Sequence, residues 1–200
     1  MGVDPAAAAG GPVAGILLAA GSSSRFGGFK LMHAIEGVPM VLQSTIAMKA
    51  ALGAVVVAVR PGSPCVPTLS GKPGIRILAC PRAPEGMGGT LADVIAALPA
   101  PAGGFIIALA DMPFIAPDTI RAVARALAGG AALVAPAYRG ERGHPVGLGA
   151  GYRNELLALT GDAGARAIVR RDAAAMTLIE VDDPGVLRDI DTPGDLVPRP

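Results

Sequence analysis

Short apolar runs alternate with amphipathic stretches along most of this chain. The runs Val13–Ala20 and Ala54–Arg60 consist mainly of aliphatic and β-branched residues, and each ends at a glycine or proline, as a buried strand does. Residues 39–52 lie between them, begin with a proline and have the apolar spacing of a helix. Strand, helix and strand in this order predict a βαβ unit, whose two strands are parallel.

The alternation continues beyond this first unit. We expect further strands at 74–80, 104–110, 131–138 and 175–181, and further helices at 90–98, 117–129, 152–159 and 163–170. The pattern predicts an α/β fold with a mostly parallel sheet that is covered by helices on both faces. At 139–151 the alternation breaks, which indicates a hairpin or a small lobe.

Composition limits the classes of protein that this chain can belong to. Its 200 residues, of which 52% are hydrophobic, suffice to bury the core of one domain, and we expect a single domain over residues 13–200 after a flexible N-terminal tail, 1–12. Seventeen basic and sixteen acidic residues leave a net charge of +1, and only 3% of the residues are aromatic. Neither a nucleic-acid partner nor a base-stacking surface is therefore expected.

The cysteines and the first residues indicate a cytoplasmic protein without a membrane segment. Cys65 and Cys80 are not spaced as metal ligands and are expected to be reduced structural thiols. The first fifteen residues lack the basic segment of a signal peptide, and their apolar runs are too short to cross a bilayer.

The loop after the first predicted strand, LLAAGSSSRFGGFKL, has the composition of a phosphate site. Its small residues leave backbone amides accessible, and Arg25 and Lys30 supply positive charge. A Walker loop is excluded because Gly21 and Gly27 are separated by five residues and Leu31 follows Lys30. The Gly-x-Gly of a dinucleotide site is missing as well. From the residues of this loop alone, a solvated turn remains an equal alternative.

Asp111 follows another predicted strand, in the stretch ALADMPFI. A carboxylate at the end of a buried strand is costly unless it has a partner, and Mg²⁺ bridging phosphates is a suitable one. The alternative is a capping or turn aspartate, but Pro113 and Pro117 disfavour a helix that begins at Asp111.

Three other loops have explanations that need no ligand. The three glycines of EGMGGT, 85–90, let backbone groups approach a nucleobase, or they form a flexible loop in which Thr90 is the N-cap of the next helix. In GDAGAR, an N-cap at Asp162 with Arg166 four residues later explains the pattern without a ligand. His144 in RGERGHPVG is most simply a loop or strand-edge histidine.

Near the C-terminus, LRDIDTPGDL places two carboxylates at a spacing of two. In an extended segment Asp189 and Asp191 would face the same side and could present paired carboxylates to a metal ion. Alternatively, Asp191 caps a short terminal helix.

Together, these segments resemble one family. The stretches LAAGSSSRFGGFKL, EGMGGTL, ADMPFI, RGHPV, LTGDAGAR and DIDTPGDL occur in the order shown by MobA-like nucleotidyltransferases, and they are most similar to the molybdenum cofactor cytidylyltransferase branch. The resemblance spans about Val13 to Leu196. No single stretch is decisive, but six in the same order are specific.

The resemblance implies a Rossmann-like, three-layer α/β/α fold of the nucleotide-diphospho-sugar transferase type. It also implies a set of site residues: Leu18, Ala19, Ala20 and Gly21 for nucleotide binding, Arg25 and Lys30 for the phosphates and catalysis, Asp111 for catalysis and Mg²⁺, and Gly88 and Thr90 for the base. Asp191 is a weaker candidate for the metal, and His144 and Asp189 are candidates for the acceptor side.

By the same resemblance, the chain is a Mg²⁺-dependent enzyme that transfers CMP from CTP to the phosphate of molybdopterin or its molybdenum-bearing form. Ala20, in LAAG rather than LAGG, favours a pyrimidine nucleotide. The alternatives are another phosphorylated acceptor, a guanylyltransferase that uses GTP, and a non-catalytic chaperone that delivers the molybdenum cofactor to a client molybdoenzyme. Three residues depart from the family pattern: Ala110, Gly89 and Gly147. We expect the Ala110 methyl group to lie near the triphosphate.

Overall fold

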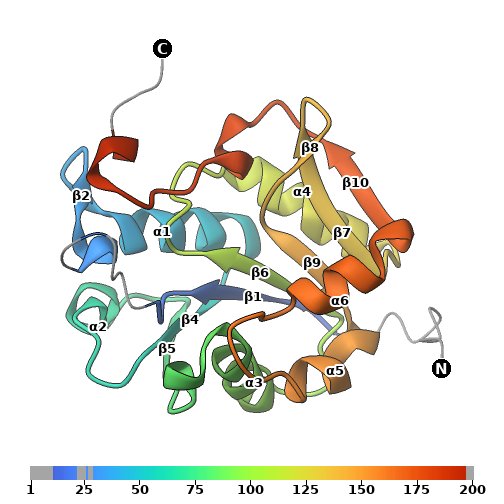
Figure 1. The fold of residues 1–200 in the computed structure, drawn as a ribbon, viewed down its shortest axis with the longest axis horizontal. Coiled ribbons are helices and arrows are strands. Elements are labelled where there is room, and N and C mark those ends of the chain that lie inside the picture. The colour runs from blue at the N-terminus through green and yellow to red at the C-terminus, as the bar shows by residue number, and fades with distance from the viewer. Residues whose placement is uncertain (1–10, 22–25, 27–28, 197–200) are drawn as a thin grey trace.

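The computed structural model describes residues 11–21, 26 and 29–196 (Figure 1). The strands of the main sheet are β1 (Val13–Leu18), β4 (Val55–Val59), β5 (Ile75–Ala79), β6 (Gly104–Leu109), β7 (Leu133–Tyr138), β8 (Glu141–Arg142), β9 (Val146–Gly149) and β10 (Met176–Glu180). They pair in the order β10-β7-β9-β6-β1-β4-β5, and β8 pairs with β7. A separate antiparallel hairpin contains β2 (Ala34–Ile35) and β3 (Val38–Pro39).

Most strand pairs in the main sheet are parallel, as the sequence predicts. β1 is parallel to both β4 and β6, β5 is parallel to β4, and β10 is parallel to β7. β9 lies between β6 and β7 and is antiparallel to both. Of the two expectations for 139–151, the hairpin is confirmed, because β8 directly follows β7 and pairs with it antiparallel. The small lobe is wrong, because β8 and β9 both belong to the main sheet.

Helices cover both faces of this sheet. The α-helices are α1 (Met40–Leu52), α2 (Cys65–Leu69), α3 (Met87–Ala97), α4 (Pro117–Ala128), α5 (Arg153–Leu157) and α6 (Arg166–Arg171). Short 3-10 turns are η1 (Lys30–Met32), η2 (Ala83–Glu85), η3 (Ala150–Tyr152), η4 (Ala173–Ala175), η5 (Pro184–Leu187) and η6 (Pro193–Leu196). Figure 1 shows α1 and α4 on one side of the sheet and α3 and α5 on the other, which confirms the three-layer α/β/α fold.

The two-residue period of the strands separates two buried clusters. Along β4, Val55, Val57 and Val59 pack into the cluster on the side of α1 and α4, whereas Val56 and Ala58 pack into the cluster on the side of α3. All five residues of β4 are buried. An uninterrupted apolar run is what a parallel strand covered on both faces requires.

Two expectations about helix caps are wrong, and one short helix is not predicted by the sequence. α3 begins at Met87, so Thr90 lies inside its first turn and is not the N-cap. α6 begins at Arg166 with Ala165 as its N-cap residue, so Asp162 precedes the helix and does not cap it. α2 escapes prediction because its sequence, CVPTL, spans only five residues and contains a proline.

The residues that depart from the family pattern are explained by packing. Ala110 is 1% exposed and belongs to the cluster on the side of α1, so its methyl group faces the core, contrary to the expectation above. A Cβ at Gly147 would lie 2.5 Å from Cγ1 of Val134, and one at Gly89 would lie 2.6 Å from the Arg82 carbonyl oxygen. Neither position has room for a larger residue.

Both cysteines are buried free thiols, in agreement with the prediction. Burial, followed by the charge of Asp93, raises the pKa of Cys80 to about 11. Burial also raises the pKa of Cys65. Protonated, buried thiols of this kind are poor nucleophiles and poor metal ligands. Within the part of the chain that the structure describes, no helix is both long enough and apolar enough to span a bilayer.

A buried carboxylate joins the start of α4 to the segment before η5. Asp183 is 8% exposed, and it accepts hydrogen bonds from the backbone N–H of Ala116 at 2.9 Å, the hydroxyl of Thr119 at 2.6 Å and the N–H of Gly185 at 3.0 Å. Three donors from two segments therefore depend on one side chain.

We expect Asp183→Ala to lower the free energy of unfolding by roughly 2–4 kcal/mol, because it leaves these three buried donors without an acceptor. Urea denaturation measures the change. Asp182→Ala removes the same charge from the exposed neighbouring position and is the matched control. Equal stability of the two variants would contradict this role of Asp183.

Candidate active site

The loops that carry the candidate residues meet at one edge of the sheet. The N–H of Ala19 donates to the Ala58 carbonyl at 2.8 Å, and the N–H of Ala110 donates to the Leu18 carbonyl at 3.0 Å. These bonds keep β4, β1 and β6 in register to their last residues. The segments that follow the three strands therefore begin side by side, at the edge where α/β sheets bind ligands.

A cleft of about 680 Å³ opens at this edge. Its lining residues come from the strand ends, η1 and the loop before it, η2, the start of α3, the start of α6 and the loop before it, and the segment before η6: Leu18, Ala20, Gly21, Phe26, Lys30, Leu31, Arg60, Ala83, Pro84, Gly86, Met87, Thr90, Leu109, Asp111, Asp162, Arg166, Asp189 and Asp191. The cleft thus combines an apolar wall with several charged side chains.

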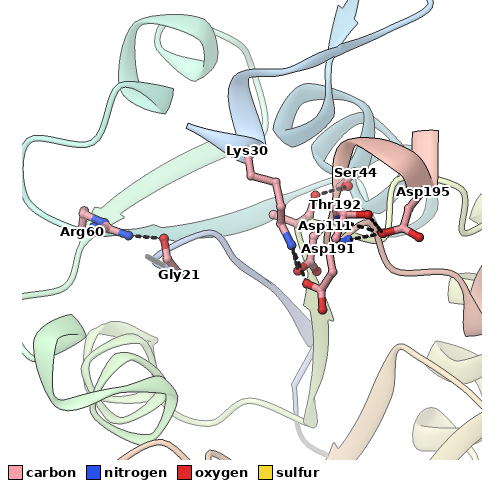
Figure 2. A network of polar contacts seen from close by, with 9 residues as sticks. Gly21, Lys30, Ser44, Arg60, Asp111, Asp191, Thr192 and Asp195 are labelled. Carbon is pink, nitrogen blue, oxygen red and sulfur yellow. Dashed lines mark hydrogen bonds and ion pairs between the residues drawn. The ribbon is translucent and has the colours of Figure 1, made fainter. Parts of the chain in front are cut away.

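The ammonium group of Lys30 lies between two of these carboxylates (Figure 2). Its Nζ is 2.8 Å from Oδ2 of Asp111 and 3.1 Å from Oδ1 of Asp191. The Lys30 side chain is only 10% exposed, compared with 27% for Asp111 and 42% for Asp191. Burial alone would lower the pKa of Lys30, but the hydrogen bonds and charges of the two aspartates outweigh burial and raise it.

Three further hydrogen bonds place the Asp191 carboxylate beside Asp111. The N–H of Ile190 donates to the Asp111 carbonyl at 2.9 Å, which holds the C-terminal segment against the end of β6. The carboxylate of Asp195 accepts from the N–H groups of Asp191 at 3.1 Å and Thr192 at 2.8 Å (Figure 2). Asp195 therefore supplies the side-chain contacts that organise the start of η6, and the Asp191 side chain faces Lys30.

The Asp111 loop is also fixed from the side of α1. The buried hydroxyl of Ser44 donates to the Ala110 carbonyl at 2.9 Å (Figure 2). The carbonyl oxygen immediately before Asp111 is thus satisfied by a helix side chain, and the carboxylate is held on a rigid part of the fold.

Arg60 is a cation of the cleft that the sequence did not single out. It follows the last residue of β4, and its guanidinium donates to the carbonyl oxygen of Gly21 in the glycine loop (Figure 2). The sequence position of Arg60 could have indicated this role, since it is the last residue of a run that is predicted to be a strand. In the structure it joins two neighbouring strand-end loops.

On the opposite wall, the start of α3 packs tightly against the segment that precedes α6. The N–H of Gly88 donates to the Gly161 carbonyl at 2.8 Å. Gly86 has a φ of +111°, and a Cβ there would lie 2.7 Å from the Gly161 carbonyl oxygen and in contact with the Asp162 carboxylate. Glycine at both positions lets two backbones meet without intervening side chains.

This contact brings Asp162 and Arg166 into the cleft, where the sequence had assigned them to capping and pairing. Both side chains are exposed. Among the residues that the structure describes, none forms a hydrogen bond or ion pair with the Arg166 guanidinium. Arg166 therefore offers an uncommitted positive charge to a ligand.

His144 lies behind the acidic edge of the cleft. Its backbone N–H donates to the Val186 carbonyl at 2.9 Å, and its buried imidazole Nδ1 has no hydrogen-bond partner within the described part of the chain. Burial lowers the pKa of His144, Arg142 lowers it further, and the carboxylate of Asp111 acts in the opposite direction. A neutral imidazole follows at neutral pH.

The structure brings most of the predicted site residues together. Those that line the cleft are Leu18, Ala20, Gly21, Lys30, Thr90, Asp111, Asp189 and Asp191. Ala19 is 4% exposed and packs in the core, and Gly88 contacts the 160–161 segment. Arg25 lies outside the described residues.

The donor set formed by Asp111 and Asp191 fits a divalent cation. Oxygen atoms of both carboxylates already converge on a positively charged group at 2.8 and 3.1 Å. The described residues include no group of three or more His, Cys, Asp or Glu side chains that could hold a metal. Two carboxylates match the way in which proteins usually hold Mg²⁺, which takes its remaining ligands from substrate phosphates and water.

The model of the family described as the MobA-like NTP transferase domain matches residues 15–176. A comparison with curated protein sequences gives no match.

Solved structures share the fold over nearly the whole chain. Rv0371c of Mycobacterium tuberculosis H37Rv, in complex with manganese, is 20% identical with a TM-score of 0.78, over 94% of this chain and 96% of that chain. A nucleotidyl transferase from Methanothermobacter thermautotroptrophicus is 22% identical with a TM-score of 0.77, over 93% and 94%. A CMP:2-keto-3-deoxy-manno-octonic acid synthetase complexed with CTP is 16% identical with a TM-score of 0.69, over 92% and 95%.

The tight wall of the cleft provides a test of this packing. A Cβ at Gly88 would touch the Thr160 carbonyl oxygen and lie 2.9 Å from that of Gly161, whereas a Cβ at Gly21 would meet no atom within 4 Å. We expect Gly88→Ala to lower the free energy of unfolding by roughly 1–2 kcal/mol, because the backbone shift outweighs the better helix propensity of alanine.

Gly21→Ala is the control for this substitution and should change stability by less than about 0.5 kcal/mol. Urea denaturation of the two variants decides between them. Equal losses of stability would show that the contact with the 160–161 segment is not tight.

Proposed function

The chain belongs to the MobA-like NTP transferase family, and we propose that it transfers CMP from CTP to the phosphate of molybdopterin or its molybdenum-bearing form. Nucleotidyl transfer follows from the family, and the nucleotide and the acceptor are the proposal. The observation that carries it is the position of Lys30 between Asp111 and Asp191 where β6 and β1 end. This arrangement supplies both signs of charge needed to bind a metal and a triphosphate.

In the proposed reaction, a phosphate oxygen of the acceptor attacks the α-phosphorus of CTP. One P–O bond forms to the acceptor, the bond between the α-phosphorus and its bridging oxygen breaks, and pyrophosphate leaves with the bonding electrons. Such a step requires positioning and charge stabilisation rather than a protein nucleophile.

The chain's own groups would act mainly on the phosphates. The amides of Ala20 and Gly21 and the cations Lys30 and Arg25 are the proposed ligands of the triphosphate. Arg60 would act as a positioning residue, because its hydrogen bond to the Gly21 carbonyl fixes the glycine loop.

Asp111 and Asp191 would hold the divalent ion, for which we propose Mg²⁺. When bound, this ion neutralises charge that develops on the phosphate oxygens. Asp111 is the better placed of the two, because its loop is tied both to β1 and to Ser44 of α1.

The wall of the cleft formed by the start of α3 is suited to a base that carries an exocyclic amino group, such as cytosine. Thr90 lines the cleft, and its hydroxyl donates to the Gly86 carbonyl at 3.1 Å. Its single proton is thereby used, so toward a ligand the Thr90 oxygen can only accept. The exocyclic amino group of cytosine is a donor, whereas uracil offers a carbonyl oxygen at that position. The peptide groups at Gly88 would complete this wall.

For the acceptor we propose the side of the cleft formed by Asp189 and Arg166, with the half-buried imidazole of His144 behind it. The uncommitted guanidinium of Arg166 is suited to a phosphate monoester, which it can bind through two parallel hydrogen bonds. The choice of molybdopterin rests on the resemblance of six sequence segments to the molybdenum cofactor cytidylyltransferase branch.

Asp111→Asn should lower kcat by on the order of a thousandfold, because it removes a charge from the proposed metal site while keeping the size of the side chain. Pyrophosphate release measures kcat. Asp162→Asn removes a charge from the opposite wall of the same cleft and should have a much smaller effect on kcat. Full activity of the Asp111 variant would refute the metal role.

The identities of the substrates are tested by a panel of nucleoside triphosphates against molybdopterin and other phosphorylated small molecules. We expect the highest kcat/KM for CTP with molybdopterin, read as pyrophosphate release that requires both substrates. A preference for GTP or for a sugar phosphate would replace the specific proposal. Tight binding of both ligands without pyrophosphate release would indicate a non-catalytic carrier instead.

A further inference from the structure

Lys30 occupies the position that the proposed divalent cation would need. Its Nζ is within hydrogen-bond distance of one oxygen from each carboxylate, at 2.8 Å to Asp111 and 3.1 Å to Asp191 (Figure 2). The same side chain is the proposed phosphate ligand of the cleft. The two aspartates use two of its three donors, so in this position only one donor remains for the triphosphate.

We propose that Lys30 is an exchangeable internal cation that makes metal binding depend on nucleotide binding. Without ligand, its ammonium holds the two carboxylates together. When the divalent ion and the triphosphate bind together, the ion takes the place between Asp111 and Asp191, and the ammonium moves to the triphosphate. This inference rests on the proposed metal and triphosphate site, and it does not depend on the identity of the base or the acceptor.

The burial of Lys30 explains why the metal alone would bind weakly. An ion that entered by itself would displace an ammonium group whose side chain is 10% exposed. That charge would lose both of its counter-ions, and a buried charge without a partner is costly. The ion would therefore gain two carboxylate ligands at the expense of an ion pair already present.

The triphosphate removes this cost because it supplies a new anionic partner for the displaced ammonium group. Lys30 lies in η1 at the end of the glycine loop region, and its four-carbon stem is flexible enough to reorient within the cleft that it lines. The metal and the triphosphate should therefore bind with positive coupling, and by linkage each should strengthen the binding of the other by the same factor.

The first test uses Mn²⁺ as the metal probe and inorganic triphosphate as the anion, with Mn²⁺ affinity measured by electron paramagnetic resonance. Lys30→Met should bind Mn²⁺ alone about tenfold more tightly than the unaltered protein, within the range of typical coupling energies. The factor by which triphosphate tightens Mn²⁺ binding should fall by a similar amount. Unchanged or weaker binding of Mn²⁺ alone would overturn the proposal.

Arg60→Met is the matched control. It removes one positive charge from the same cleft, but the guanidinium contacts the Gly21 carbonyl rather than the two aspartates. Arg60→Met should change the affinity for Mn²⁺ by less than about threefold, because it alters only the long-range electrostatic potential at the proposed metal site. An equal gain in both variants would contradict a specific exchange at Lys30.

A second measurement needs no substitution. The chain has three lysines, Lys30, Lys49 and Lys72, so ¹³C labelling at the lysine ε-carbon gives a simple spectrum. The Lys30 signal should move when Mg²⁺ and triphosphate are added together and move little with Mg²⁺ alone, while the other two signals stay in place. A Lys30 signal that ignores the combined ligands would overturn the exchange, even if the Met variant fails to fold.

These outcomes separate the inference from the function on which it rests. If the unaltered protein binds no Mn²⁺ in the presence of triphosphate, the proposed metal–triphosphate site is wrong. If it does bind Mn²⁺ but Lys30 neither competes nor moves, only the exchange is wrong.

Discussion

The parallel pairing of β6, β1 and β4 is the constraint on which the cleft depends. Because these three strands run in the same direction and stay in register to their last residues, the segments that follow them begin at one edge of the sheet. Gly21, Arg60 and Asp111 thereby come together although β-strands and helices separate them in the sequence. The helices on both faces bury the sheet and keep this edge rigid.

Charge placement within the cleft follows from the same geometry. Lys30 is 81 residues from Asp111 and 161 residues from Asp191, and the fold joins all three. The Ile190 bond to the Asp111 carbonyl and the turn organised by Asp195 bring the C-terminal segment over the strand ends. The proposed metal site would thus combine carboxylates from the middle and the C-terminal part of the chain, so it would depend on the whole fold.

The two walls of the cleft have different physical characters. The wall at β1 and β6 carries Lys30 paired with carboxylates and satisfied backbone groups. The other wall depends on close backbone contact between the start of α3 and residues 160–161, and it presents the uncommitted Arg166. Charges are thus paired within one wall, whereas the other wall has groups that can bind a ligand. This combination suits the proposed reaction, in which a triphosphate and a second substrate are held in the same space.

The sequence by itself determined the order of most of the longer elements, the mostly parallel sheet and the strand-end positions of Asp111 and the glycine loop. These features are local, because apolar runs and the residues that end them determine where strands stop. Only the tertiary structure decided that β9 runs antiparallel inside the sheet, that Asp162 and Arg166 face the cleft, and that Lys30 lies between two aspartates. Pairing direction and long-range ion pairs depend on how distant segments pack, which the pattern of nearby residues does not encode.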